Sequence, residues 1–508
     1  MTPKPGPKSA PAKEAARARV IELRRLGHSA TEITHALAGS DTPLNRTGVQ
    51  EILREEGFAR LWPRPYAARG GPLRQPLPRA QRIDFASFPA RFPTRFAGLF
   101  LIVPELIALD LPGLVKAAGY PSTRDISALS YLLSLLTFKL VSWRRHSHAS
   151  DLADDRASGL LPGLAALPKT TACSTYSYRC QHQQQLRFLS ALGKAMLANG
   201  LSAGREFDLD FHAIMHFGND PLLEEHYVPR RSQRTASVLS FFAQDSGTHN
   251  LVYANADILK RDQNREVIAF CDYWRELSGA DPGFLVFDSK LTTHKVLGEL
   301  AERGVRFLTL RQRSPGLLAQ LQKLPAQAWR SVRLERAGGH RTVQVAEDPQ
   351  VKLRDCSTPL RQLAVRGLGH EHPTIHITND RDLTARYLIE RYAHRMDVEQ
   401  RLAEWIRAFH LDALSSSIPL NVDLDVVLSV LAGAVCASFR RRLRSHETVT
   451  PDTLQRRFFA TPGHVRISAR EVTVRLELRA ATPVLRQAAL PVVQVPWWGG
   501  RRLRFEIP

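Results

Sequence analysis

The chain has 508 residues, of which 44% are hydrophobic and 23% charged, so several globular domains are expected rather than one core. Seventy Lys and Arg against 49 Asp and Glu give a net charge of +21, which indicates a polyanionic partner, nucleic acid before an anionic membrane surface. No run is apolar enough to span a bilayer, because the most apolar stretch, residues 426–439, has only the length of a core helix.

Two further features predict a cytoplasmic protein. The first 13 residues lack the apolar segment of a secretion signal. The five cysteines form no Cys-x-x-Cys pair, which predicts reduced thiols and no zinc site. They are Cys173, Cys180, Cys271, Cys356 and Cys436.

Residues 1–61 are predicted to form a DNA-binding head after a disordered start. Three short helices are expected, with a Ser29–Glu32 capping box at the second and Asn45 or Thr47 at the start of the third. This order is typical of a helix-turn-helix module, whose last helix lies in the major groove, although small three-helix bundles also bind proteins. The exposed candidates for DNA contact are Arg46, Thr47 and Gln50.

Residues 62–82 are rich in Pro, Gly and Arg and are predicted to be a basic linker able to follow a phosphate backbone. Residues 83–204 are predicted to form an all-α domain, because long apolar stripes of helical period dominate them. A basic cluster in this segment either touches DNA or lies in a solvated loop. Its members are Arg144, Arg145, His146 and His148.

The period changes at residue 205, where apolar and polar residues alternate and place Asp208, Asp210 and His212 on one face of a strand. The order β-β-β-α-β-α-β follows, with a strand buried on both faces that ends at Asp288. That order predicts an RNase H-like α/β domain over residues 205–445. The expected strands are 205–217, 234–245, 250–257, 284–290 and 305–313, and the expected helices are 265–279 and 293–303.

A β-rich insertion is predicted at about residues 315–375, and a β-rich basic tail at residues 446–508. The fold class is therefore multidomain α+β. Between these parts, residues 391–409 are predicted to form one amphipathic helix. Its polar lane is Glu390, His394, Asp397, Arg401 and Glu404, and its core-facing lane is Leu388, Tyr392, Arg395, Glu399, Leu402 and Ile406.

Two charges in a core-facing lane need a partner, a metal or a substrate. The simpler alternative is an Arg395–Glu399 ion pair on a solvated edge. In an RNase H-like sheet the first strand lies beside the fourth and the last helix covers both, so Asp210, Asp288 and Glu399 are expected to converge. Three carboxylates that repel one another would be stabilised by two Mg²⁺ ions, a pair that serves phosphoryl transfer.

Tyr392, Arg395 and Glu399 match the Tyr-x2-Arg-x3-Glu part of a signature that ends in x6-Lys. In these residues the chain resembles the cut-and-paste DDE transposases of bacterial insertion sequences. The final Lys is absent, since Ile406 stands at its position and Arg407 follows. The resemblance covers about residues 200–445.

The resemblance implies a transposase that nicks transposon ends and joins them to target DNA. Asp210, Asp288 and Glu399 would be the catalytic residues and the ligands of two Mg²⁺ or Mn²⁺ ions. The family places a short polar residue and Thr after its first Asp, whereas Phe211 and His212 follow here, so Asp208 is an alternative first acid. The residues implied to contact DNA phosphates are Tyr392, Arg395 and Arg407.

The partners implied are double-stranded DNA, as inverted-repeat ends and as target, and a second copy of the chain on paired ends. The location implied is the bacterial cytosol at the nucleoid, without a membrane. Two other functions stay open: a transposase-derived DNA-binding regulator without cleavage activity, and another RNase H-like nuclease. Metal-dependent cleavage, and a comparison of transposon-end with branched DNA, would separate them.

Overall fold

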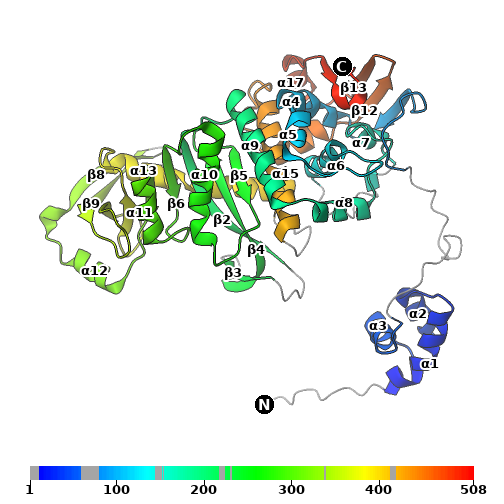
Figure 1. Ribbon diagram of the computed structural model, residues 1–508, viewed down its shortest axis with the longest axis horizontal. Coiled ribbons are helices and arrows are strands. Elements are labelled where there is room, and N and C mark those ends of the chain that lie inside the picture. The colour runs from blue at the N-terminus through cyan, green and yellow to red at the C-terminus, as the bar shows by residue number, and fades with distance from the viewer. Residues whose placement is uncertain are drawn as a thin grey trace. The chain divides into compact units, whose positions relative to one another are not determined.

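The chain folds into two compact units, residues Met1–Pro76 and Leu77–Pro508, in the computed structural model (Figure 1). The structure describes residues 11–58, 79–142, 151–152, 154–216, 223–228, 232–336, 339–411 and 419–508. Most of the predicted linker lies outside the described residues, as do the first ten residues, which were predicted to be disordered, and the basic cluster at residues 144–148.

The first unit is a bundle of three helices around a small apolar core that includes Val20, Ile33 and Ile52. The capping box predicted at Ser29 and Glu32 is present, and Asn45 caps the third helix by accepting a hydrogen bond from the Gly48 amide. The helices are α1 (Pro11–Arg25), α2 (Ala30–Leu37) and α3 (Arg46–Glu55).

The second unit contains a ten-stranded mixed sheet in the order β3-β4-β2-β6-β7-β11-β10-β9-β8, with β5 paired to β4. Strands β2, β6 and β7 are parallel, and β4 and β5 continue the sheet beyond β2 in antiparallel fashion. The five predicted strands are found, together with one short strand, β3, that was not predicted. They are β2 (Glu206–Met215), β3 (Glu225–Val228), β4 (Gln233–Asp245), β5 (Leu251–Asn255), β6 (Phe284–Phe287) and β7 (Arg306–Leu310).

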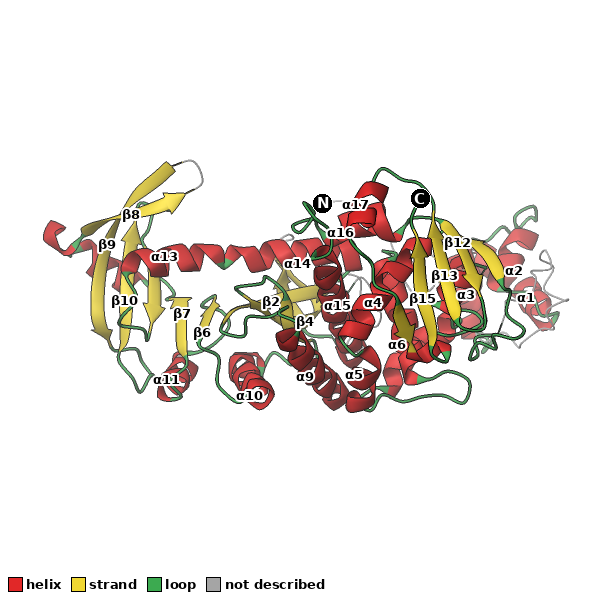
Figure 2. Ribbon diagram, turned by 90° about the horizontal axis from the view of Figure 1, so that it is seen from above, coloured by secondary structure: helices red, strands yellow, loops and turns green. Residues whose placement is uncertain are grey.

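Helices cover both faces of this sheet (Figure 2). Alternate residues of β6 point to opposite faces, so Leu285 and Phe287 join a different apolar cluster from Phe284 and Val286. All four are buried, as predicted for a strand with both faces covered. One face carries α10 (Glu266–Ser278) and α11 (His294–Glu302), and the other carries α13 (Ala385–His394).

The predicted β-rich insertion consists mainly of strands, and these strands extend the same sheet. β11 pairs with β7 in antiparallel fashion, and β10, β9 and β8 follow outward. The insertion is therefore not a separate small domain. Its elements are α12 (Pro315–Gln322), β8 (Arg330–Arg336), β9 (Gly339–Val351) and β10 (Leu360–Arg366), and β11 (Thr374–Thr378) lies at its predicted end.

A five-stranded sheet in the order β1-β12-β13-β15-β14 corrects two predictions. Strand β1 (Arg91–Thr94) lies in the segment predicted to be all-α and pairs with β12 in the predicted tail. Trp498 is fully buried, and its Nε1 donates a hydrogen bond to the carbonyl of Leu160 at 2.8 Å. Residues 446–508 are therefore part of a core shared with residues 83–204. The strands are β12 (Gly463–Ile467), β13 (Glu471–Leu476), β14 (Val493–Val495) and β15 (Arg501–Glu506).

Helix α15 (Pro419–Arg440) runs through the unit and packs against α6, α9 and β5. Its stretch from Val422 to Arg440 is long and apolar enough to cross a membrane by length and composition, but 89% of the relevant window is buried inside the protein. That burial is the pattern of a core helix. It also contacts α4. The helices of the segment predicted to be all-α are α4 (Val103–Ala108), α5 (Leu111–Ala118), α6 (Ala128–Leu140), α7 (Arg156–Leu160), α8 (Thr170–Tyr176) and α9 (His182–Ala198).

Two ionic contacts tie α15 to its neighbours. Lys139 Nζ of α6 lies 2.7 Å from Asp425 Oδ2, and His182 Nδ1 of α9 lies 2.7 Å from Asp423 Oδ2. Asp423 is fully buried and also accepts a hydrogen bond from the Ala256 amide just after β5. A buried carboxylate needs such partners, so these contacts fix α15 in the core.

The mixture of helices and sheets confirms the multidomain α+β prediction.

Candidate functional site

The strand register brings two of the predicted acids together. β2 and β6 are parallel, with Asp208 opposite Val286 and Leu209 opposite Phe287. The next position on each strand is Asp210 and Asp288, so these two lie side by side at the carboxyl end of β6. Asp208 and Asp210 are two residues apart on one strand and therefore face the same side of the sheet.

The third acid comes from a helix that is broken where one continuous helix was predicted. α13 ends at His394, Arg395 lies between the helices, and α14 (Met396–Phe409) begins after it. The break changes which residues point inward, and the predicted lanes are wrong in two places. Glu399 is exposed, with 46% of its side chain accessible, and Glu404 is buried and paired with Arg401 at 2.7 Å. The buried lane consists of Leu388, Arg391, Arg395, Val398, Leu402, Trp405 and Phe409.

Arg395 connects two of the acids. Its Nη2 lies 3.1 Å from Glu399 Oε1 and its Nη1 lies 3.5 Å from Asp210 Oδ1. The predicted Arg395–Glu399 pair therefore exists, and it joins a buried arginine that is only 5% exposed to an exposed glutamate at the edge of the site. Nε and Nη1 of Arg395 make no hydrogen bond among the described residues. A buried guanidinium with unused donors is poised for a further acceptor.

The electrostatics of Asp210 differ from those of an ordinary aspartate. Burial, opposed by Arg395 and reinforced by Glu399 and Asp288, raises the pKa of Asp210 to about 6. The influence of both other acids on Asp210 places all three in one electrostatic environment. A strongly shifted carboxyl group between charged neighbours is typical of functional sites, although buried ion pairs also produce one.

Asp208, the alternative first acid, has a different environment. It accepts hydrogen bonds from Arg391 Nη1 at 2.7 Å and from Ser246 Oγ at 2.9 Å, and it is 2% exposed. Arg391 Nε also lies 3.2 Å from Glu206 Oε2. Both oxygens of Asp208 are occupied within the protein. This geometry favours a structural role for Asp208 and leaves Asp210 as the acid beside Asp288.

The donor chemistry of the three acids suits a hard divalent cation, because Mg²⁺ prefers carboxylate oxygens. Across the described ranges, however, no three His, Cys, Asp or Glu side chains are grouped closely enough to hold a metal ion. The Arg395 guanidinium lies between Asp210 and Glu399 and supplies the positive charge there. A metal would therefore have to share this position with Arg395 or displace it.

The cysteines are all free, and Cys356 alone is not buried.

The other predicted contact residues lie in three places. Tyr392 packs edge-on against His376 at 5.2 Å between ring centroids, and its ring faces the Arg395 guanidinium at 5.8 Å. Burial raises the pKa of Tyr392 to about 12, so the phenol is neutral near pH 7. Arg407 is exposed on α14. In the first unit, Arg46, Thr47 and Gln50 are all exposed at the start of α3.

Sequence reasoning missed two residues of this region. Arg391 anchors α13 to β2, and it was detectable as a second arginine one helical turn before Arg395. His376 is 2% exposed on β11, its Nδ1 has no partner among the described residues, and burial lowers its pKa to about 4. A single histidine in an apolar strand did not mark this position as part of a site.

No protein-family model matches the chain, and no curated protein is significantly similar to it.

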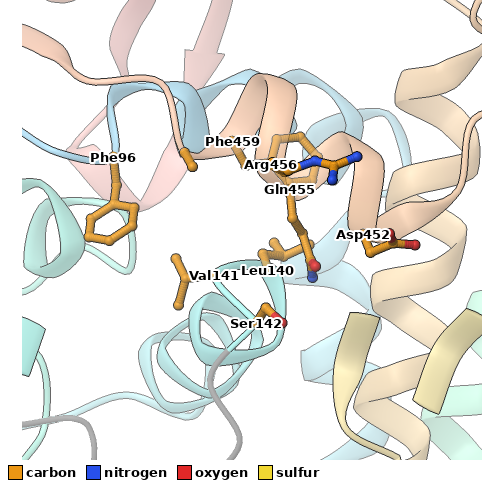
Figure 3. Close-up of a pocket in the computed structure, with 9 residues that line it drawn as sticks. Phe96, Leu140, Val141, Ser142, Asp452, Gln455, Arg456 and Phe459 are labelled. Carbon is orange, nitrogen blue, oxygen red and sulfur yellow. The ribbon is translucent and has the colours of Figure 1, made fainter. Parts of the chain in front are cut away.

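A cavity of about 290 Å³ lies elsewhere in the second unit, between the end of α6 and the π-helical turn η8 (Gln455–Phe459) (Figure 3). Phe96, Val141 and Phe459 give it an apolar wall, and Asp452 and Arg456 a polar one. It shares no residue with the acidic site.

Proposed function

We propose that the chain is a DDE-type DNA transposase that cleaves DNA at insertion-sequence ends and joins them to a target. The strand order β5-β4-β2-β6-β7, with the first three strands antiparallel and the last two parallel to β2, supports an RNase H-like core. The three-helix unit, with polar residues exposed at the start of α3, supports a helix-turn-helix head.

The observation that carries the proposal is the position of Asp210 and Asp288, each one residue after the last registered pair of β2 and β6, with Arg395 reaching Asp210 and Glu399 from the covering helices. Three chain segments far apart in sequence meet at this point. A purely structural ion pair would need only one acid for Arg395. Here two acids share it, and Asp288 adds to the local negative potential.

In this proposal Asp210, Asp288 and Glu399 would hold Mg²⁺ or Mn²⁺ after Arg395 moves away from Asp210, and the ion would supply Lewis-acid stabilisation of charge at the scissile phosphate. Arg395 has unused donors and can bind a phosphate oxygen, a contact that would draw it away from Asp210. Tyr392, as a neutral phenol, can donate a hydrogen bond to the same DNA strand. Water attacks the phosphorus and the P–O3′ bond breaks, which leaves a 5′-phosphate and a free 3′-hydroxyl. In joining, that 3′-hydroxyl attacks a target phosphodiester, and the 3′-oxygen of the target strand leaves.

The net charge of +21 supports duplex DNA as the partner. Joining two ends requires two active sites, so the proposal includes a homodimer on paired ends, acting in the bacterial cytosol.

The test is a comparison of Glu399→Gln with Asp397→Asn on the same helix. Among the residues that the structure describes, the one ion pair of Asp397 is with His394 at 3.7 Å. Asp397 is 42% exposed, so its substitution is a matched loss of one negative charge. The DNA is a duplex taken from the flanks of the coding region. We expect Glu399→Gln to bind this duplex with wild-type affinity and to cleave it more than about 100-fold more slowly than wild type. Asp397→Asn should cleave normally.

If Glu399→Gln cleaves as well as wild type, or if wild type binds DNA and never cleaves it, the proposal is wrong. Binding without cleavage would favour the DNA-binding regulator instead.

A further inference from the structure

A second polar pocket opens at the carboxyl end of the parallel strands, beside the loop that follows Asp288. Its volume is about 630 Å³, and we call it the α11 pocket. The pocket lies on the side of the sheet that α11 covers. Thr309 and Arg311, which line it, are two and four residues after Phe307 and therefore share its strand face. Phe307 belongs to the same apolar cluster as the buried residues of α10 and α11. Ligands of open α/β sheets commonly bind beyond this edge of the strands.

The first feature of the α11 pocket is the start of α11. Thr293 is the N-cap residue and makes no side-chain cap hydrogen bond, so the first amides of the helix are not satisfied by it. Ser289, Thr292 and Thr293 line the same region. A helix start with free amides attracts anions, and hydroxyl groups add donors.

The second feature is a pair of cations, Lys295 and Arg311, that form no ion pair with a carboxylate among the described residues. Asp348 acts electrostatically on Arg311 and Glu299 on Lys295, without direct contact. Arg311 is half-buried and its Nη1 donates to Gln362 Oε1 at 2.6 Å, a neutral group. Lys295 lies on the first turn of α11, and the nearest helical acid, Glu299, is bound by Arg265 at 2.8 Å. Within the described part of the chain, neither cation makes an ion pair. The one acid on the pocket wall, Asp355, is 72% exposed and faces Arg354 at 3.7 Å.

The third feature is independent of charge. Thr309 lines the pocket, is 1% exposed, and its Oγ1 has no hydrogen-bond partner among the described residues. A buried hydroxyl without a partner costs free energy and needs an explanation. Together with the helix start and the two cations, it indicates a ligand with several acceptor oxygens and negative charge.

We infer that the α11 pocket binds a backbone phosphate of the DNA strand that enters the proposed active site. The inference rests on the proposed function. It adds Lys295, Thr309 and Arg311 to the residues that contact DNA, on the opposite side of the sheet edge from Arg395. A phosphodiester fits because it offers two charged oxygens to the helix start and a guanidinium. The two sites are adjacent in the chain, because Ser289 lines the pocket and directly follows Asp288 of the proposed active site.

The first test is Thr309→Val, which removes the hydroxyl and keeps the side-chain volume. The loss of an unpartnered hydroxyl should leave the melting temperature of the full-length protein unchanged or higher. Affinity for a labelled duplex that carries DNA from the flanks of the coding region should fall about 2- to 10-fold. A structural hydroxyl would give the reverse pattern, a lower melting temperature with unchanged affinity, and would overturn the inference.

The second test compares Lys295→Gln with Lys323→Gln, which removes the same charge from an exposed position after α12. For Lys295→Gln we expect affinity to fall about 3- to 10-fold and the slope of log affinity against log salt concentration to decrease by about 1. Lys323→Gln should match wild type. Equal effects of the two variants would mean general charge attraction and would overturn the inference.

Inorganic phosphate serves as the probe for a free anion site. Stabilisation by inorganic phosphate that depends on Lys295, without any effect of Lys295→Gln on DNA affinity, would contradict a DNA contact. Cleavage measured in the same samples separates this inference from the proposed function. If wild type cleaves DNA and Lys295→Gln has wild-type DNA affinity, the inference about the α11 pocket is wrong and the proposed function stands. If Lys295→Gln lowers DNA affinity but wild type does not cleave DNA, the pocket binds DNA and the proposed function is wrong.

Discussion

Asp210 is the residue whose chemistry distinguishes this site from a structural ion pair. Its carboxyl group is 17% exposed and has a pKa of about 6, against an ordinary value of 3.8. A raised carboxyl pKa means that the folded protein binds more protons than the unfolded chain between about pH 4 and pH 6. Stability associated with this group is therefore present below pH 4 and is lost as the pH rises through 6.

We predict that the stability of Asp210→Asn relative to wild type increases between pH 4 and pH 7, by up to about 3 kcal/mol, because the variant does not ionise at this position. Thermal melts of both proteins across this pH range, without divalent metal, test it. Asp397→Asn, a substitution at a 42% exposed carboxylate, should show no such trend. A pH-independent difference between wild type and Asp210→Asn would show that Asp210 titrates normally.

Arg391 and Asp208 form the ion pair that anchors α13 to the sheet. Both side chains are buried, at 8% and 3% exposure, and their atoms lie 2.7 Å apart. Removing one partner leaves the other charge buried without compensation.

We predict that Arg391→Met destabilises the protein by about 3 kcal/mol or more, and that the double variant Arg391→Met, Asp208→Asn recovers most of the loss. Chemical denaturation of the single and double variants measures the coupling. Additive losses would show that the two side chains do not act as a pair, and Asp208 would again be a candidate for the first acid.

At the scale of elements, the break between α13 and α14 decides how the site is assembled. Arg395 lies at the break and points inward, whereas Glu399 on the first turn of α14 stays at the edge of the site. A continuous helix would turn later residues to different faces. The sequence pattern did predict that Arg395 and Glu399 would be close, since they are four residues apart. It did not predict the break, because no Pro or Gly marks it.

The strands that carry Asp210 and Asp288 were predictable for a physical reason. Alternation of apolar and polar residues from Phe207 to His212 is typical of a strand, and four consecutive apolar residues at 284–287 are the pattern that burial on both faces imposes. The structure buries Asp208 along with Phe207 and Leu209, which alternation alone does not predict. The short strand β1 was not predictable in the same way. It has four residues, includes Pro93, and pairs with a strand more than 360 positions later in the sequence. Local patterns carry no information about such a partner.

At the scale of the whole molecule, the C-terminal segment belongs to a core rather than to a tail. β12 pairs with β1, and the Trp497 and Trp498 indole groups donate hydrogen bonds to Leu161 and Leu160 in the segment predicted to be all-α. Residues 446–508 were predicted to be a β-rich basic tail, because the sequence shows short strands and basic residues there but not which apolar residues meet a distant partner.

We predict that deletion of residues 446–508 prevents folding of the second unit, since it removes four of five strands and exposes the apolar surface that they cover. Deletion of residues 1–76, which form the other compact unit, should leave the melting temperature of the remainder unchanged. Soluble yield and thermal melts of the two truncated chains provide the comparison. A folded chain without residues 446–508 would show that this segment is dispensable.

The most direct test of the central claim is cleavage of a labelled duplex that carries the inverted repeat flanking the coding region, with Mg²⁺ or with EDTA. Wild type and Asp288→Asn would be compared side by side. The proposed function predicts Mg²⁺-dependent nicking at the repeat boundary by wild type, abolished by EDTA and absent in Asp288→Asn, with similar binding by both proteins. Tight binding by wild type without cleavage under any divalent metal would contradict it.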